Sequence, residues 1–297
     1  MRVFISIIAF VLFISNPLLA QENEFIEEKA PKKIDKPVRS PFGSGYLIDN
    51  LSTDVPIKKT LEFIIQHKFG IIENGSSDLF GIYAPGSNIR MGLNYVLFDN
   101  VQLGYGLTKK NMNSDFNIKW SVLKQTRKNT MPVSLTLFAN LALDGRNKDV
   151  FGIDYSSTNR ISYFSQAIVS RKFTDWLSLQ VAGSFTHYNS VDTILDHDKV
   201  GIHFSGRVKF SPQSSFIFNY DIPLDIESLY SSYGNEALKP KPNLAFGVEI
   251  ATSTHAFQIF IGTADGLLPQ DVMMYNRNDF TKGEMALAFS ITRLWNF

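Results

Sequence analysis

Apolar residues alternate with small or polar ones along the last thirteen residues of the chain, MALAFSITRLWNF. Every second position from Met285 to Phe297 is apolar except Arg293, and the intervening positions are mostly Ala, Ser, Thr and Asn. Successive side chains of a β-strand point to opposite faces, so the pattern predicts a strand with one apolar face. Such a strand must place that face against a protein core or against lipid.

The same alternation recurs almost without interruption from Thr60 to the end of the chain. Short connections (FDN, KFTD, SPQ, TSTH) exchange with long ones such as DGRNKDVFGIDYSST. A transmembrane β-barrel sorts its connections in this way, whereas a secreted soluble β-protein, the alternative fold, has no reason to do so. The pattern predicts about twelve strands, at residues 61–71, 88–97, 101–107, 116–122, 133–143, 161–169, 177–185, 200–210, 215–220, 244–250, 257–262 and 285–297.

The N-terminal residues indicate export. MRVFISIIAFVLFISNPLLA combines a basic residue with an apolar run from Val3 to Ile14, which is typical of a signal peptide cleaved near Ala20. That run is shorter than the roughly 20 residues of a spanning helix. The chain contains no cysteine, which excludes a disulfide framework and a lipidated N-terminal cysteine.

These observations predict an all-β protein of the bacterial outer membrane. We expect a signal peptide at 1–20, an extended periplasmic linker or lead-in at 21–59, which is rich in charge and proline, and an outer-membrane β-barrel at 60–297. The barrel is expected to be a transmembrane antiparallel one of about twelve strands, with short periplasmic turns and long extracellular loops.

Aromatic residues gather at the strand ends beside the short turns, where a membrane interface would accommodate their rings. They are Phe98, Phe173, Trp176, Phe210, Phe216, Phe257, Trp295 and Phe297. The last strand also carries an apolar set that resembles the C-terminal signal read by the outer-membrane assembly machinery: Phe289, Ile291, Trp295 and Phe297. We therefore expect the lipid bilayer and this machinery as partners.

Several strings resemble a Bacteroidota-type outer-membrane β-barrel family catalogued as domain of unknown function fifty-seven seventy-seven. They are HKFG (67–70), DLFGIYAPGSNIRMGLNY (78–95), MPVSLTLFA (131–139), SRKF (170–173), HAFQIFI (255–261) and KGEMALAFSITR (282–293). The resemblance covers roughly residues 60–297. It implies a barrel and a location, and it implies no activity.

Little in the sequence indicates catalysis or a cofactor. The formal net charge of +1 gives no basis for nucleic-acid binding, and the five histidines lack the spacing of metal ligands, so we expect no metal and no cofactor. GIHFSGR is similar to the Gly-x-x-His-x-Ser-Asn-Gly string of outer-membrane phospholipase. However, the alternation directs His203 and Ser205 into the lumen, whereas that chemistry needs the outer face. We therefore predict that the protein is not an enzyme.

Polar residues on the inner face predict a hydrophilic interior. The candidates are Glu62, Lys68, Arg90, Lys119, His203, Arg207, Lys209 and Glu249, and the excess of basic groups favours anions. Two interpretations remain open: these residues line a path, or they pair with one another and fill the interior. Apolar residues also point inward, which favours a narrow or plugged lumen: Phe138, Phe164, Ile168, Ile217 and Phe260.

Two functions are consistent with this pattern. The first is a narrow or plugged channel, or binding barrel, for a small solute. The alternative is a structural or partner-binding barrel that acts through its extracellular loops, from Asp221 to Pro242 and from Thr263 to Gly283. In the alternative, exposed LYSSYG and MMYN stretches would suit a surface partner.

Overall fold

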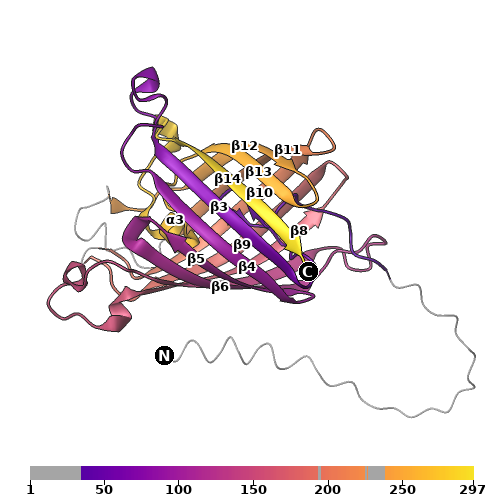
Figure 1. Ribbon diagram of the computed structural model, residues 1–297, viewed down its shortest axis with the longest axis horizontal. Helices are drawn as coiled ribbons and strands as arrows, with labels where there is room; N and C mark the ends of the chain where they lie inside the picture. The colour runs from indigo at the N-terminus through magenta and orange to yellow at the C-terminus, as the bar shows by residue number, and fades with distance from the viewer. Residues whose placement is uncertain (1–34, 193–194, 225, 227–237) are drawn as a thin grey trace, which may run out of the picture. The chain divides into compact units, whose positions relative to one another are not determined.

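Twelve antiparallel strands close into a barrel in the computed structural model, which describes residues 35–192, 195–224, 226 and 238–297 (Figure 1). The predicted signal peptide and residues 21–34 of the predicted linker lie outside the described residues. The wall strands are β3 (Thr60–Ile71), β4 (Asn88–Phe98), β5 (Val101–Thr108), β6 (Asn113–Leu123), β7 (Ser134–Leu143), β8 (Ile161–Lys172), β9 (Leu177–Tyr188), β10 (Asp198–Lys209), β11 (Ser214–Leu224), β12 (Asn243–Ala251), β13 (His255–Gly262) and β14 (Ala286–Asn296).

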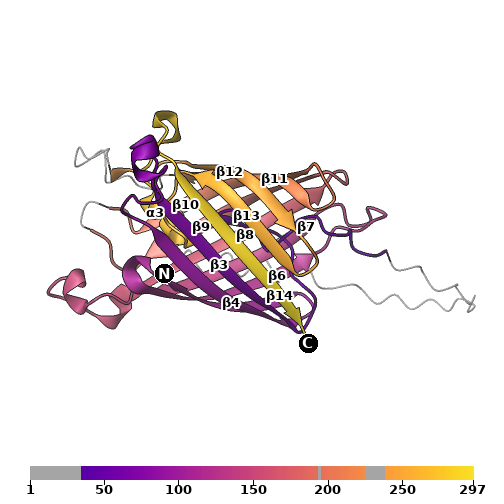
Figure 2. The ribbon, with the colours of Figure 1, turned by 45° about the horizontal axis from the view of Figure 1, so that its top comes forward.

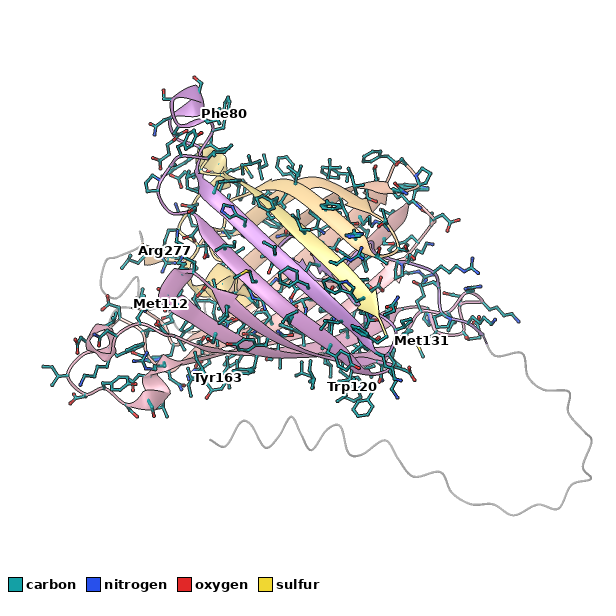
Figure 3. The ribbon with its side chains drawn as sticks, in the orientation of Figure 1. Phe80, Met112, Trp120, Met131, Tyr163 and Arg277 are labelled. Carbon is teal, nitrogen blue, oxygen red and sulfur yellow. The ribbon has the colours of Figure 1, made fainter. Side chains whose placement is uncertain are left out.

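The barrel closes between its last and first strands. β14 pairs with β3, with Trp295 opposite Leu61 and Asn296 opposite Thr60. Burial alternates along the strands as the sequence pattern requires, for example from buried Thr60 to partly exposed Leu61 in β3. Trp120 and Tyr163 project from the outer surface (Figure 3). The predicted strand number, antiparallel order and facing are confirmed.

Connections of different length lie at the two ends of the barrel (Figure 2). The short-turn end, which the sequence assigns to the periplasm, carries residues 99–100, 124–133, 173–176, 210–213 and 252–254. The long-loop end carries the described residues 72–87, 109–112, 144–160, 189–192, 195–197, 238–242 and 263–285, with short 3-10 turns Gly75–Asp78, Lys110–Met112, Lys148–Phe151, Ser157–Arg160 and Phe280–Lys282. All eight aromatic residues predicted at the short-turn end are exposed. Among the described residues, no helix is long and apolar enough to cross a membrane.

The segment before the first wall strand enters the lumen. We call residues 41–54 the plug; they contain the hairpin β1 (Tyr46–Leu47) and β2 (Asn50–Leu51). Their buried apolar residues pack against inward-pointing residues of the wall. One cluster joins Leu47 to Ile217 and Phe260, and a second joins Leu51 to Phe138, Phe164 and Ile168. The sequence predicted an extended periplasmic lead-in here, with entry into the barrel mouth as the alternative. The plug residues fold inside because the inner wall offers an apolar surface to cover.

A second segment enters from the opposite end. Residues 263–285, the α3 loop, contain the short helix α3 (Pro269–Tyr275), of which five residues are buried. Met273 and Met274 are each 1% exposed, so the expectation that MMYN forms an exposed surface is wrong. The methionines lie in the lumen because the second cluster, which contains Phe138, Phe164 and Ile168, gives Met273 an apolar contact. The LYSSYG stretch lies outside the described residues.

Candidate functional site: a closed polar lumen

Arg90 is the centre of a buried ion pair on the lumen side of β4. Its Nε and Nη2 bind the two carboxylate oxygens of Asp115 at 2.8 and 2.7 Å, and its Nη1 donates to Gln66 at 3.1 Å. Two parallel N–H···O bonds fix both side chains in one geometry. Gly106 makes room for the pair, because a Cβ there would lie 2.4 Å from Arg90 Nη2.

Lys68 connects the plug to the α3 loop. Its Nζ lies 2.6 Å from the Asp49 carboxylate of the plug and donates to the carbonyls of Ala264 and Gly266 at 2.8 and 2.9 Å. The side chain is almost fully buried. A buried ammonium group is tolerated when its three donors are all used, and here they are.

Lys119 and Glu62, two more predicted lumen residues, are both buried, but only the lysine bonds to the plug. Lys119 Nζ donates to the carbonyl oxygens of Gly45 and Asp54, at 3.3 and 2.6 Å. Glu62 Oε2 accepts from the side-chain amides of Asn94 and Gln102, each at 2.9 Å. The lysine therefore contacts the plug, whereas the glutamate is satisfied by the wall.

Glu249 and Arg207 form a further buried group near the short-turn end. Glu249 Oε2 accepts from Ser44 Oγ and from Gln258 Nε2, each at 2.9 Å. Arg207 Nε donates to Ser215 Oγ at 2.8 Å and lies 3.4 Å from Glu249 Oε1. Lys209, at the end of β10, is only partly buried. The structure thus places seven of the eight predicted lumen residues in the closed interior and Lys209 at its mouth.

His203 belongs to a hydrogen-bonded chain that sequence analysis did not identify. Its Nδ1 lies 2.9 Å from Asp221 Oδ1, and its Nε2 lies 2.7 Å from the Oγ of Ser184, a serine of β9. This order of groups resembles a hydrolase triad. However, all three side chains are at least 93% buried, and a Cβ on Gly201 would lie 2.6 Å from both Ser184 Oγ and Met273 Sδ, so the α3 loop packs over the serine. These three hydrogen-bonded side chains are therefore part of the contact between the wall and the plug.

Besides the apolar clusters, the plug contacts the wall through hydrogen bonds to polar side chains. Asn50 Nδ2 donates to Ser205 Oγ at 2.8 Å and to Asp221 Oδ1 at 2.7 Å. Thr53 Oγ1 lies 2.5 Å from Ser170 Oγ. Plug carbonyls accept from the wall as well: Thr136 binds Thr53, Gln180 binds Leu51, and Gln258 binds Tyr46. Because the partners come from β7 to β13, the plug is fixed on several sides.

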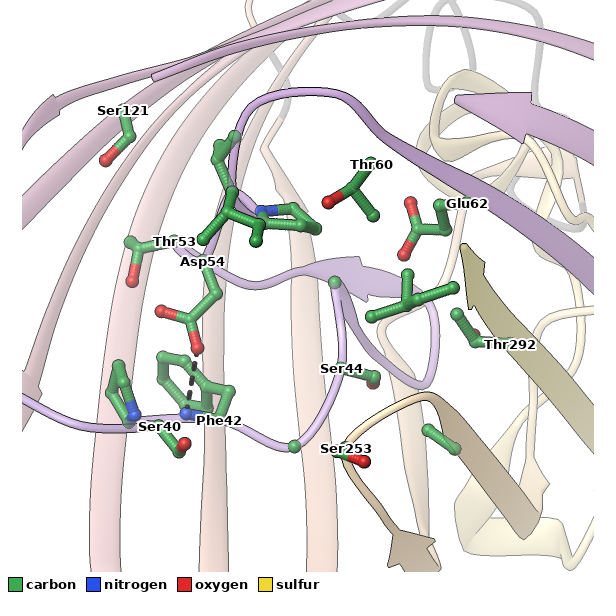
Figure 4. A pocket seen from close by; sticks show the side chains of 18 of the residues that line it. Ser40, Phe42, Ser44, Thr53, Asp54, Thr60, Glu62, Ser121, Ser253 and Thr292 are labelled. Carbon is green, nitrogen blue, oxygen red and sulfur yellow. Dashed lines mark hydrogen bonds between the residues drawn. The ribbon is translucent and has the colours of Figure 1, made fainter. Parts of the chain in front are cut away.

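A cavity of about 540 Å³ remains at the short-turn mouth, between the plug and the ends of the wall strands (Figure 4). Asp54 lies on its plug side and accepts from the backbone N–H of Phe42 at 3.1 Å (Figure 4). Burial raises the pKa of the Asp54 carboxyl from its ordinary value to about 6, although this hydrogen bond and the charges of Lys119, Arg207 and Lys124 act in the lowering direction. Among the described residues, no group of three or more His, Asp or Glu side chains is arranged to hold a metal ion.

The predicted assembly residues lie on the closing strand. Phe289 stacks on His67 of β3, with ring centroids 5.2 Å apart, and Ile291 pairs with Ile65. Trp295 is 38% exposed, with the guanidinium of Arg293 5.5 Å from its ring centre. Arg293 also contacts His255 of β13. Arg293 lies on the outer surface close to the short-turn end, and this position accounts for an arginine on an otherwise apolar face.

The family model named Membrane bound beta barrel domain (DUF5777) matches residues 42–295. The chain belongs to this family. This DUF5777 protein is therefore a membrane-bound β-barrel, and the match begins at residue 42, inside the plug. No curated protein sequence matches it.

Three solved structures are similar to this DUF5777 barrel. The COG4313 outer membrane channel from Pseudomonas putida F1 has a TM-score of 0.48 and 13% identity, covering 82% of this chain and 97% of that one. A NanC porin structure has a TM-score of 0.47 and 8% identity, covering 80% and 99%. The KdgM porin has a TM-score of 0.45 and 7% identity, also covering 80% and 99%.

Proposed function

We propose that this barrel passes or binds a small solute in the outer membrane, through a lumen that the plug and the α3 loop close. The observation that carries the proposal is the polar attachment of the plug: Asn50, Thr53 and the carbonyl of Leu51 are held by wall side chains that water could equally well satisfy. When a segment attached in this way leaves, water can satisfy the polar wall groups that it held. An interior filled only for stability would be more stable with apolar side chains at these positions.

Unused hydrogen-bonding capacity on the wall also supports the proposal. An unpaired buried polar atom costs about 1–3 kcal/mol, and hydration would recover much of that cost. Among the described residues, such atoms without a hydrogen-bond partner belong to these lumen-facing wall side chains: Asn94, Thr108, Ser121, Gln166, Gln180 and Thr186. Gln270 and Asp271 of the α3 loop each have one as well. The wall is therefore better suited to a hydrated lumen than to the closed one.

The tip of the plug is strained. Ile48 has a φ of 59°, a left-handed conformation that β-branched residues rarely adopt, and its side chain is 1% exposed. Such strain costs of order 1–3 kcal/mol and persists only when surrounding contacts enforce it. Release of the plug would relieve it, which lowers the cost of opening.

Opening would also change the charge of the lumen. Arg90 and Arg207 have carboxylate partners on the wall, so they stay paired when the plug moves. Lys68 binds the Asp49 carboxylate of the plug, and Lys119 binds two plug carbonyls, so both lysines lose these partners when the plug moves. The predicted preference for anions is thus assigned to Lys68 and Lys119 in the open lumen.

A disulfide lock tests the proposal. The native chain has no cysteine, and the hydroxyl oxygens of Thr53 and Ser170 are 2.5 Å apart, so Thr53→Cys with Ser170→Cys should form a bridge between plug and wall. In planar bilayers we expect the reduced double variant to carry ion current or solute flux, and oxidation to suppress it reversibly. Ser170→Cys alone should not respond to oxidant.

Two results would contradict the proposal. If the oxidised and reduced double variants conduct equally, the plug does not gate the lumen. If neither they nor the parent protein pass ions or solute, the channel function should be abandoned for the partner-binding alternative. Burial of the α3 loop removes one of the two loop surfaces on which that alternative depended.

A further inference from the structure

The cavity at the short-turn mouth has the size of a small-molecule site. Its volume of about 540 Å³ lies within the usual range of roughly 300–1,000 Å³ for ligand pockets. Residues 37–57 form one side, and the ends of β3, β6, β13 and β14 contribute to the other. A molecule in the cavity would therefore contact the plug segment and the barrel wall together.

Hydroxyl groups dominate the polar lining. Ser40, Thr53, Ser121, Ser253 and Thr292 surround the cavity together with the carboxylate of Asp54 (Figure 4). A hydroxyl group both donates and accepts, so this lining matches a ligand whose own groups do both.

The carboxylate of Asp54 has unused hydrogen-bonding capacity. A carboxylate can accept about four hydrogen bonds. The Asp54 carboxylate receives one from Phe42 N–H. Because polar groups that are shielded from solvent are normally paired, this carboxylate indicates that a hydrogen-bond donor completes the site.

The charges of the lining do not favour an ion. The negative charges of the lining are the carboxylates of Asp54 and Glu62, and Glu62 already accepts hydrogen bonds from two amides. Lys124 also lines the cavity, but its Nζ donates to the Asp99 carbonyl at the surface. Pro41, Val55 and Pro56 add apolar surface, which suits the C–H face of a sugar ring.

We infer that this cavity binds an uncharged, hydroxyl-rich molecule of monosaccharide to disaccharide size. The inference goes beyond the proposed function, since binding here needs no passage through the lumen. Because plug residues form one side of the site, the ligand binds only when the plug is in place. Binding therefore stabilises the closed barrel in proportion to ligand concentration.

Calorimetric titration of the full-length barrel tests the inference, in a detergent without a sugar headgroup. The probes are maltose, the cation glucosamine and the anion gluconate. We expect maltose to bind, with a preference over both ions. Asp54→Ala removes the accepting carboxylate and should weaken maltose binding about fivefold. The control, Thr186→Ala, removes a buried hydroxyl outside the cavity and should bind like the parent.

Absence of heat with maltose would overturn the inference, and so would equal maltose affinity in Asp54→Ala and the parent. Tighter binding of glucosamine or gluconate would overturn the assignment to an uncharged ligand. Calorimetry registers binding whether or not the barrel conducts. Failure of this test therefore leaves the disulfide-lock experiment unaffected, and failure of that experiment leaves this one unaffected.

Discussion

Replacing Lys68 by methionine should loosen both segments that close the lumen. The ammonium group binds the plug and the α3 loop at once, through Asp49 and the carbonyls of Ala264 and Gly266. Methionine has nearly the same length and no donor. It therefore leaves the Asp49 carboxylate buried, with the amide of Asn243 2.9 Å away as its remaining side-chain donor.

The expected loss follows from that unpaired charge. Removing one partner of a buried ion pair typically costs about 3–5 kcal/mol, because the other charge remains in a medium of low polarity. The two carbonyls add to the loss, and relaxation of the plug reduces it, so we expect about 3–5 kcal/mol for the lumen contacts. Asp49→Asn in the same chain removes the stranded charge and should recover about half of the loss.

Limited proteolysis of the folded barrel measures plug release, and guanidinium unfolding followed by gel mobility measures global stability. We expect Lys68→Met to expose the plug to cleavage under conditions in which the parent is resistant. The control is Lys109→Met, because the Lys109 ammonium is exposed and binds only Ser87 at the long-loop end; its effect should stay within about 0.5 kcal/mol. The reasoning is refuted if the two variants resist cleavage and denaturant equally.

Two further predictions concern the mouth and the closing strand. Because the pKa of Asp54 is raised, the docked plug is most stable below about pH 4 and loses about 1–2 kcal/mol of stability as the pH rises through about 6. Proteolytic cleavage of the plug in the parent protein should therefore increase over that range. A flat pH profile, or the same profile in Asp54→Asn, would contradict this prediction. Trp295→Asp or deletion of Phe297 should leave the protein undelivered and degraded, whereas Trp295→Phe should accumulate normally; parental levels of Trp295→Asp in the membrane fraction would disprove a signal there.

The wall could be predicted from sequence because its information is local. Each strand shows its facing through a period of two, so the twelve strands and the inward direction of Lys68 and Arg90 follow from short windows. Pairing within the lumen is different. Arg90 meets Asp115 through the packing of β4, β5 and β6, and the acidic partner of Lys68 comes from the plug. Neither partner can be identified from the facing of one strand.

The plug could not be predicted because its folding depends entirely on distant contacts. Its apolar residues show neither strand nor helix periodicity, and its two-residue strands are too short to be detected. α3 has seven residues, about half the length at which an isolated helix becomes stable. The inward apolar residues, such as Phe138 and Ile217, were the one available signal. They form the surface that the two segments cover.

The position of the plug in the chain determines when it can dock. Its wall partners run from Lys68 on β3 to Gln258 on β13, so its binding surface is complete only after nearly all strands have paired. The plug also leads directly into β3, the strand that β14 must reach to close the barrel. Docking is therefore coupled to closure of the β14–β3 seam.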